Sequence, residues 1–171
     1  DGLNVSRINA DLTSDTDTTQ AIALGQNRNV VFMGDTKGGA FDIDWSKARE
    51  LLAIPNSNSR SNLEVICPWV NGGDITKRRR AMWIIDFGCD MPEPEAAGFE
   101  APFRLVEQHV KPVRRTNRRA TYADKWWIHV EPRPAMRAAT DRLSRVLFTT
   151  NVSKHRLFAW ITYPTLPDHA G

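Results

Sequence analysis

Short runs of alternating or continuous hydrophobic residues recur along this chain, and stretches rich in Gly, Pro, Asn and Ser separate them. Alternation with a period of two predicts a half-buried strand, and a short continuous apolar run predicts a buried one. Strand-like runs fall at 5–12, 29–35, 41–43, 63–70, 81–88, 126–130, 144–150 and 155–163. The last two flank the turn-like sequence NVSK, so we expect two strands joined by a turn there.

Three segments carry hydrophobic residues at helical spacing. The segment 45–54 follows Asp44, whose short acidic side chain is suited to cap a helix N-terminus. The segment 93–110 has acidic residues near its start, which favours a helix dipole, and Pro112 is expected to end the helix. A third helix is predicted within 132–145. Its inward-facing positions are Met136, Ala139 and Leu143.

These runs predict an α+β fold with five or six strands in mixed, mostly antiparallel sheets and three or four short helices. The regular βαβ alternation of a doubly wound sheet is missing. No internal repeat, low-complexity tract or Gly/Ser linker divides the 171 residues. The sequence therefore predicts that residues 1–171 form a single domain.

The composition favours a reduced protein without a membrane span. Cys67 and Cys89 lack the spacing of a zinc site, and we expect both to be packing residues. No apolar run approaches the ~18 residues of a transmembrane helix, and the start lacks the features of a signal peptide. We therefore expect a cytoplasmic protein. Because the sequence begins at Asp1 and ends on a loop-like tail, we also expect it to be a fragment of a longer chain.

Positive charge is concentrated in one part of the sequence. Residues 104–156 carry 13 Lys or Arg and 4 Asp or Glu, a net charge of +9, whereas residues 1–103 carry 10 against 15. Such a block is typical of proteins that bind a phosphate backbone, because each neutralised phosphate releases condensed counterions. We expect the block to form one contiguous cationic surface. A solvated surface without a partner is the alternative.

Three basic clusters combine guanidinium groups with short polar side chains, which hold phosphates and read the edges of bases. They are KRRR at 77–80, RRTNRR at 114–119 and SKHR at 153–156. The segment 113–125 is expected to be an exposed connector. The candidate DNA-binding residues are Lys77, Arg78, Arg79, Arg80, Arg114, Arg115, Arg118, Arg119, Ser153, Lys154, His155 and Arg156. For the adjoining Trp126 and Trp127, packing in the core or against a sheet is preferred to base stacking.

Motifs for catalysis are missing from the sequence. The segment 34–39, GDTKGG, lacks the GxGxxG spacing of a nucleotide-binding loop, and no polar-Pro-Pro-aromatic segment occurs. The four histidines are scattered without ligand spacing. Asp86 is the one acid inside an apolar strand. It caps the following turn or pairs with an arginine, or else it holds Mg²⁺ in a nuclease site.

Six unremarkable strings then give the sequence a more specific interpretation. In order, the chain holds INADL, PNSNSRSNLEVICPWVNGGDI, RRAMWIIDFG, PFRLVEQHVKPVRRTNR, KWWIHVEPRPAMR and VSKHRLFAW. This order resembles the target-recognition region of MmeI-like (type IIL) restriction-modification enzymes and related DNA methyltransferases, from about Ile8 to Trp160. The positions that match the recurring pattern are Trp83, Asp86, Phe87, Gly88, Trp126, Trp127, Lys154, His155, Arg156 and Phe158.

The resemblance implies sequence-specific recognition of double-stranded DNA while an adenine is flipped for N6-methylation. It also implies that S-adenosylmethionine and the methyltransferase domain belong to the same parent chain, with or without a fused endonuclease. This fragment is then expected to hold no catalytic residue, cofactor or metal, and to contact no membrane. Two alternatives remain: a small metal-dependent nuclease centred on Asp86, and a basic module that binds an acidic protein partner.

Overall fold

The computed structural model describes residues 4–10, 12–14, 16–17, 19, 21–154 and 157–170. The contacts within the chain define two units, residues 1–31 and residues 32–171. The first unit includes the short 3-10 helix Gly25–Asn27. No strand forms among its described residues within 5–12, where the hydrophobic pattern predicted one. The organisation of residues 1–171 as one target-recognition domain stays a prediction.

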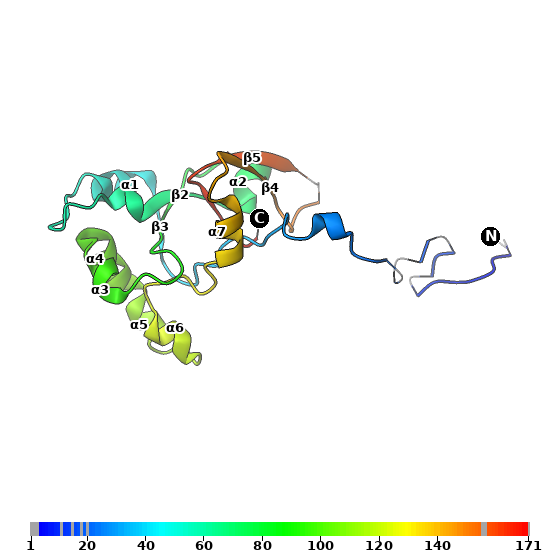
Figure 1. The fold of residues 1–171 in the computed structure, drawn as a ribbon, viewed down its shortest axis with the longest axis horizontal. Helices are drawn as coiled ribbons and strands as arrows, with labels where there is room; N and C mark the ends of the chain where they lie inside the picture. The colour runs from blue at the N-terminus through cyan, green and yellow to red at the C-terminus, as the bar shows by residue number, and fades with distance from the viewer. Residues whose placement is uncertain are drawn as a thin grey trace. The chain divides into compact units, whose positions relative to one another are not determined.

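The second unit is built around a four-stranded sheet with the strand order β1-β3-β2-β6 (Figure 1). The strands are β1 Asp42–Ile43, β2 Ile66–Val70, β3 Trp83–Ile85 and β6 Leu166–Pro167. Strand β3 pairs antiparallel with both β1 and β2, whereas β6 pairs parallel with β2. The runs at 63–70 and 81–88 thus form the centre of the sheet. The parallel edge strand β6 was not predicted from the sequence.

A separate two-stranded hairpin forms where the sequence predicted one. Strand β4, Arg145–Thr149, pairs antiparallel with β5, Phe158–Thr162. Phe148 and Ile161 from the hairpin are buried together with Val70 at the end of β2. Ile75 from the neighbouring helix α2 packs against the same cluster. This small second core attaches the hairpin to both β2 and α2.

The described residues include seven α-helices, more than the three or four predicted. They are α1 Trp45–Leu52, α2 Gly72–Thr76, α3 Glu93–Ala97, α4 Glu100–His109, α5 Lys111–Arg114, α6 Ala120–Asp124 and α7 Pro134–Thr140. Asp44 caps α1 as expected, since its carboxylate accepts a hydrogen bond of 2.8 Å from the amide of Lys47. The segment 93–110, predicted as one helix, forms α3 and α4, and α6 lies in the segment 113–125, which was predicted as a connector. The α+β class with mostly antiparallel pairing is confirmed.

Several local predictions are wrong. The segment 29–35 is not a strand: Asp35 and the adjacent Thr36 form only isolated bridges. The segment 126–130 is a buried turn rather than a strand. Helix α4 ends at His109, before Pro112 as predicted, but Pro112 itself lies in the first turn of a further short helix, α5, where a missing amide hydrogen is tolerated. In α7 and the turn after it, Met136 is buried as predicted, whereas Ala139 and Leu143 are exposed.

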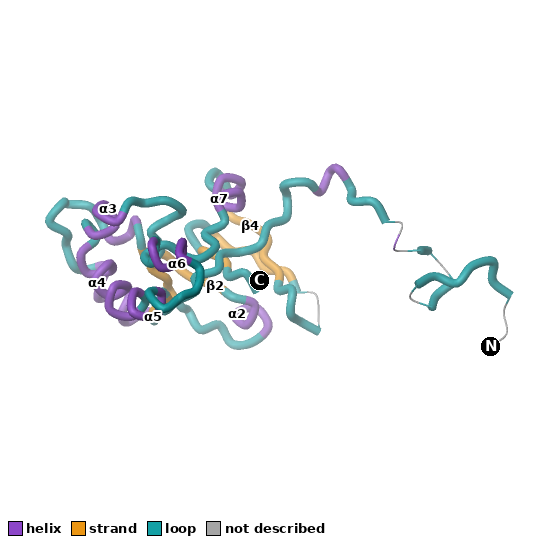
Figure 2. The backbone as a smooth tube through the Cα atoms, turned by 90° about the horizontal axis from the view of Figure 1, so that it is seen from below, coloured by secondary structure: helices purple, strands orange, loops and turns teal. Residues whose placement is uncertain are grey.

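The main core is formed by the sheet, helices α1, α3, α4 and α7 and the segment 126–128, and several of its side chains are aromatic. Figure 2 shows helices α3 to α6 grouped together beside the strands. Phe87 lies against Phe103, which in turn contacts Trp126 at a ring-centroid distance of 5.1 Å. Trp126 and Trp127 are 4% and 7% exposed, and the indole of Trp127 donates a 2.8 Å hydrogen bond to the carbonyl of Met91. Their assignment to the core, rather than to base stacking, is confirmed.

Candidate nucleic-acid interface

The cluster at 77–80 leaves helix α2 and leads into β3. Lys77, Arg78 and Arg79 are exposed, and none of the three forms an ion pair with a described residue. Arg80 differs, because its guanidinium binds the buried carboxylate of Asp74 with nitrogen–oxygen distances of 3.0 and 2.9 Å. Three cations of this cluster are therefore available to an anionic partner, whereas the charge of Arg80 is compensated within the fold.

Arg114 is buried, contrary to the expectation that segment 113–125 is an exposed connector. Only 2% of the residue is accessible. Its guanidinium donates to the backbone carbonyls of Gly38 at 3.0 Å, Lys37 at 2.9 Å and Ile128 at 3.3 Å. Burial lowers the pKa of Arg114 from its usual value. Helix α5 thus uses Arg114 to join two loops, and the side chain does not reach solvent.

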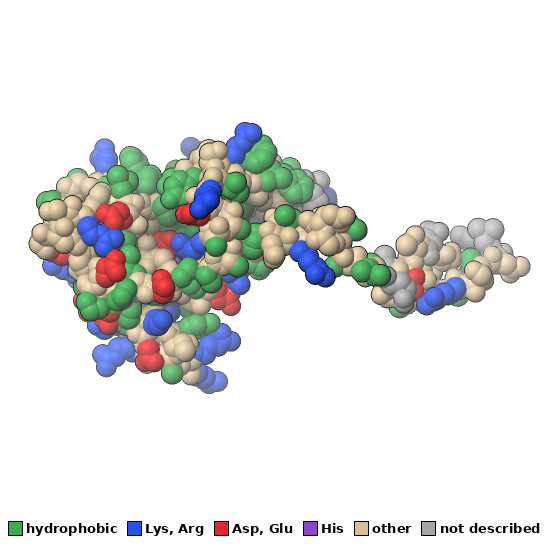
Figure 3. Space-filling view, in the orientation of Figure 1, with side chains coloured by type: hydrophobic (Ala, Val, Ile, Leu, Met, Phe, Trp, Pro, Cys, Tyr) green, Lys and Arg blue, Asp and Glu red, His purple; other side chains and the backbone are tan. Residues whose placement is uncertain are grey.

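The turn between α5 and α6 presents the other three cations of that cluster. Arg115, Arg118 and Arg119 are exposed, and Figure 3 shows Lys and Arg side chains gathered around these two helices. The guanidinium of Arg119 donates a 2.8 Å hydrogen bond to the hydroxyl of Tyr122 and lies over its ring. No ion pair to a described acid compensates these three arginines. We call Arg115, Arg118 and Arg119 the α5–α6 surface.

The third cluster lies in the turn of the β4–β5 hairpin. Lys154 is exposed and Ser153 is half-buried. The two remaining candidates, His155 and Arg156, lie outside the described residues. Because α2 and the hairpin share a core, we call Lys77, Arg78, Arg79 and Lys154 the α2–hairpin surface.

The +9 block does not form the single surface expected from the sequence. Figure 1 places α5 and α6 apart from α2 and the β4–β5 hairpin, so the cations divide between two surfaces. Some of the charge is also internal. Besides Arg114, Arg133 donates to the carbonyl of Gly34, and Arg137 binds buried carboxylates. Counting charge along a sequence cannot separate exposed guanidinium groups from those that hold the interior together.

A buried ionic cluster joins Asp35, Asp86, His129 and Arg137. The guanidinium of Arg137 contacts Asp35 at 2.7 Å and Asp86 at 2.6 Å. Nδ1 of His129 lies 2.7 Å from the carboxylate of Asp35, and its Nε2 lies 3.0 Å from the carbonyl of Ile85. Because a carboxylate and a carbonyl only accept hydrogen bonds, both contacts form when both ring nitrogens carry protons. Two cations then balance two carboxylates.

The contacts of Asp86 show what this acid does within an apolar strand. One carboxylate oxygen accepts a 3.0 Å hydrogen bond from the amide of Gly88, and both oxygens contact Arg137. Burial alone raises the pKa of Asp86, but His129 and Arg137 outweigh it and lower that pKa below the usual value. Asp86 therefore both caps the turn and pairs with an arginine. Within the described ranges, no three His, Cys, Asp or Glu side chains gather as a metal site requires.

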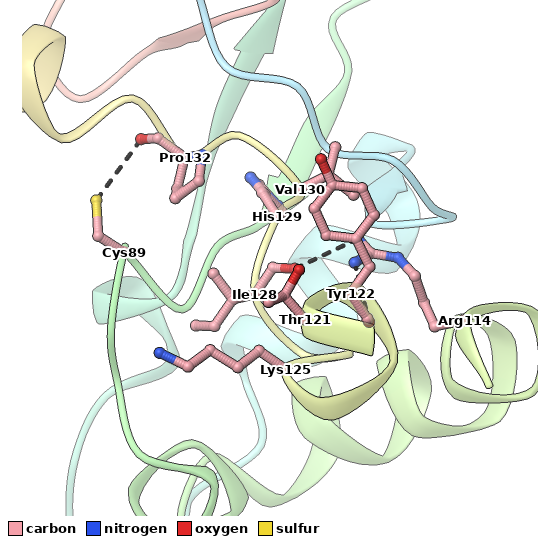
Figure 4. Close-up of a pocket in the computed structure, with 9 residues that line it drawn as sticks. All are labelled: Cys89, Arg114, Thr121, Tyr122, Lys125, Ile128, His129, Val130 and Pro132. Atoms are coloured by element: carbon pink, nitrogen blue, oxygen red, sulfur yellow. Dashed lines mark hydrogen bonds between the residues drawn. The ribbon is translucent and has the colours of Figure 1, made fainter. Parts of the chain in front are cut away.

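A pocket beside α6 is lined by residues from several segments of the chain. Figure 4 shows the side chain of Lys125 along one wall and Cys89 at the far end, with the ring of Tyr122 in front of Arg114. The thiol of Cys89 faces the carbonyl of Pro132 at 3.7 Å, and burial raises its pKa. A raised pKa lowers the fraction of thiolate, which is the nucleophilic form of a cysteine. The lining also includes His129, whose ring nitrogens contact Asp35 and the carbonyl of Ile85.

One feature of the hairpin was missed in the sequence. Arg145 from β4 lies over the ring of Trp160 from β5, with 4.4 Å between the guanidinium carbon and the ring centroid. Leu147 pairs directly with Trp160 and is also exposed. The alternation in each strand already places Arg145 and Leu147 on one face and Phe158 and Trp160 on one face. The hairpin register then sets Leu147 opposite Trp160.

Comparison with known proteins shows a similarity of fold. No protein-family model and no curated protein matches this sequence. A solved structure of the type IIL restriction-modification enzyme MmeI in complex with DNA is similar, with a TM-score of 0.61 and 14% sequence identity. The match covers 98% of this chain and 22% of that chain, so this chain spans about a fifth of the MmeI chain. The two proteins share a fold, in agreement with the resemblance carried by the six sequence strings.

In the part of the chain that the structure describes, no helix combines the length and apolar character needed to cross a bilayer.

Proposed function

We propose that this chain is a target-recognition domain that binds duplex DNA for a restriction-modification DNA methyltransferase. The observation that carries the proposal is the similarity, over 98% of the chain, to an enzyme solved in complex with DNA. The six ordered sequence strings support the same family. In this proposal the domain reads a specific sequence, and the adenine-N6 methyltransferase domain with its S-adenosylmethionine belongs to the same parent polypeptide. The chain itself then needs no catalytic residue.

The exposed cations support a phosphate-binding role. The α5–α6 surface offers three arginines and the α2–hairpin surface offers four further cations, none of them ion-paired with a described acid. Each cation that replaces a condensed counterion on DNA contributes to affinity and makes the affinity depend on salt. Because the two surfaces lie on separate elements, they suit contacts at separated points of the phosphate backbone.

A titration with duplex DNA at several salt concentrations tests the proposal. If the surfaces contact phosphates, log affinity falls with log salt concentration, at a slope of roughly −0.9 for each contact. Arg115→Ala, Arg118→Ala and Arg119→Ala should each reduce the magnitude of that slope by about one unit. Arg49→Ala is a matched control, because Arg49 is an exposed arginine on α1, outside both surfaces.

Two results contradict the proposal. One is the absence of duplex binding at low salt, where non-specific electrostatic attraction is strongest. The other is binding whose salt dependence is unchanged in all three arginine variants. A protein partner that binds the same surfaces, and that excess duplex fails to displace, would instead favour the basic protein-interaction module.

A further inference from the structure

The outward face of the β4–β5 hairpin carries a row of exposed hydrophobic side chains. Leu147, Phe158 and Trp160 are 55%, 62% and 59% exposed. The register places Leu147 opposite Trp160 and Thr149 opposite Phe158, so the three side chains are neighbours on one face. Figure 3 shows hydrophobic side chains gathered over these strands. The opposite face is buried in the second core, so the fold does not need this row for its own packing.

Arg145 completes this face at the open end of the hairpin. Its guanidinium is stacked on Trp160 and forms no ion pair with any described residue. Stacking on an aromatic ring holds the plane of a guanidinium group and leaves its N–H edge free to bind an acceptor. Arg145 is thus oriented in advance for a planar acceptor pair, such as the N7 and O6 atoms of guanine.

The charges around this face favour an anionic partner. The six outward residues include no carboxylate; they are Arg145, Leu147, Thr149, Phe158, Trp160 and Thr162. Arg145 lies at one end of the row and Lys154 in the turn at the other. Lys77, Arg78 and Arg79 follow α2, which packs on the inner side of the hairpin. A second copy of this chain would bring like charges together.

The size and shape of the face favour DNA over a protein. Three large apolar side chains make a small patch, whereas a standard protein interface contains roughly 20–30 residues on each side. A two-stranded antiparallel ribbon fits into the major groove of B-DNA. Apolar side chains in that groove contact the methyl group of thymine, and arginine binds the edge of guanine.

We propose that the outward face of the β4–β5 hairpin enters the major groove of duplex DNA. Arg145, held by Trp160, binds a guanine edge, while Leu147 and Phe158 contact thymine methyl groups. The inference rests on the proposed function and adds which surface faces the bases. It assigns specificity to residues separate from the phosphate-binding arginines of the α5–α6 surface.

The thymine contact is tested with two short duplexes of alternating sequence, dA·dT and the same sequence with uracil in place of thymine. Such a duplex has only two distinct binding registers, and both present thymine methyl groups along the major groove, so the recognised sequence need not be known. The unsubstituted chain should bind the uracil duplex more weakly than the thymine duplex, by about fourfold for each thymine methyl group that the hairpin touches. Leu147→Ser and Phe158→Ser should remove this difference. Leu63→Ser, at an exposed leucine outside the hairpin, should keep the difference.

The guanine contact is tested with an alternating dG·dC duplex and its 7-deazaguanine form, which lacks the N7 acceptor. The unsubstituted chain should lose at least about fivefold in affinity when 7-deazaguanine replaces guanine. Arg145→Lys retains the charge and the salt dependence but should lose the discrimination. Trp160→Ala should lose it too, because the guanidinium is no longer held in place. An unchanged discrimination in Arg145→Lys would overturn the assignment of Arg145.

These measurements separate failure of the inference from failure of the proposed function. If the unsubstituted chain binds no duplex at all, both the proposed function and the inference are wrong. If it binds with a salt dependence that requires the α5–α6 surface, but all hairpin variants and modified duplexes behave like the parent, only the inference is overturned. If Leu147→Ser instead abolishes self-association and leaves DNA binding unchanged, the face is an interface between copies, and the inference is likewise wrong.

Discussion

Arg80 binds Asp74 through its backbone amide and its side chain together, with three nitrogen–oxygen distances of 2.9 to 3.0 Å. The amide of Asn71 donates a further 2.9 Å hydrogen bond to the same carboxylate. Burial alone raises the pKa of Asp74, but hydrogen bonds from Arg80 and Asn71 outweigh it and lower that pKa to about 2. This arrangement closes the basic turn back onto the start of helix α2.

The lowered pKa of Asp74 predicts a dependence of stability on pH. A carboxyl group with a lower pKa in the folded state stabilises the fold above its unfolded pKa, and this stabilisation is lost as pH falls through the folded value. The contribution is roughly 1–2 kcal/mol at neutral pH and declines between about pH 4 and pH 2. Urea unfolding of the parent and Asp74→Asn should therefore differ at pH 7, and the difference should shrink below pH 4. A difference that stays constant down to pH 3 would contradict this explanation.

Arg114 is predicted to act on stability and not on DNA binding. Arg114→Met leaves the carbonyls of Lys37, Gly38 and Ile128 without their charged donor, and such losses cost about 1–3 kcal/mol. Chemical denaturation measures the cost, and the salt titration measures the slope for duplex binding. Arg115→Met is the matched control, since Arg115 is the adjacent exposed arginine. It should change the slope and leave the free energy of unfolding within about 0.5 kcal/mol. The reverse pattern would show that Arg114 contacts DNA.

The sequence predicted those elements whose residues determine them locally. Asp44 lies directly before α1, and the hairpin strands alternate around a polar turn, so neighbouring residues suffice to place both. Burial of Arg114 depends on carbonyl groups about 76 positions away in sequence, at Gly38 and Lys37. No local pattern contains that information. The same reason applies to β6, whose parallel pairing with β2 joins residues from distant parts of the chain.

Two apolar runs misled the sequence interpretation for another reason. The run 126–130 is buried, but as a turn whose side chains enter the aromatic core, and a short apolar run does not distinguish a buried strand from a buried turn. In the run 29–35, Val30 and Val31 are 64% and 82% exposed. Exposure of this kind removes the packing that makes β-branched residues favourable in strands. The candidate DNA-binding clusters were located as segments, but their division into two surfaces required the fold.

Arg137 is predicted to be essential for the stability of the buried ionic cluster. Its removal in Arg137→Ala leaves Asp35 without one partner, and it takes from Asp86 the only cation among the described residues within hydrogen-bonding distance. Removing one member of a buried ion pair costs about 3–5 kcal/mol, because a charge remains buried without compensation. Arg142→Ala, at an exposed arginine just after α7, should cost less than about 0.5 kcal/mol. Similar small costs for both variants would mean that the cluster contributes little to folding.

Trp127 provides the final prediction, which separates core packing from contact with bases. Trp127→Ala removes a buried indole and its hydrogen bond to Met91, so it should lower the free energy of unfolding by about 3–5 kcal/mol. Trp45→Ala is the comparison, because Trp45 is 49% exposed and contacts Trp83 only from the surface. It should cost clearly less. The conservative Trp127→Phe keeps most of the packing, so a stably folded Trp127→Phe should bind duplex DNA like the parent. A large loss of affinity in that variant, with its unfolding free energy nearly intact, would place Trp127 at the DNA after all.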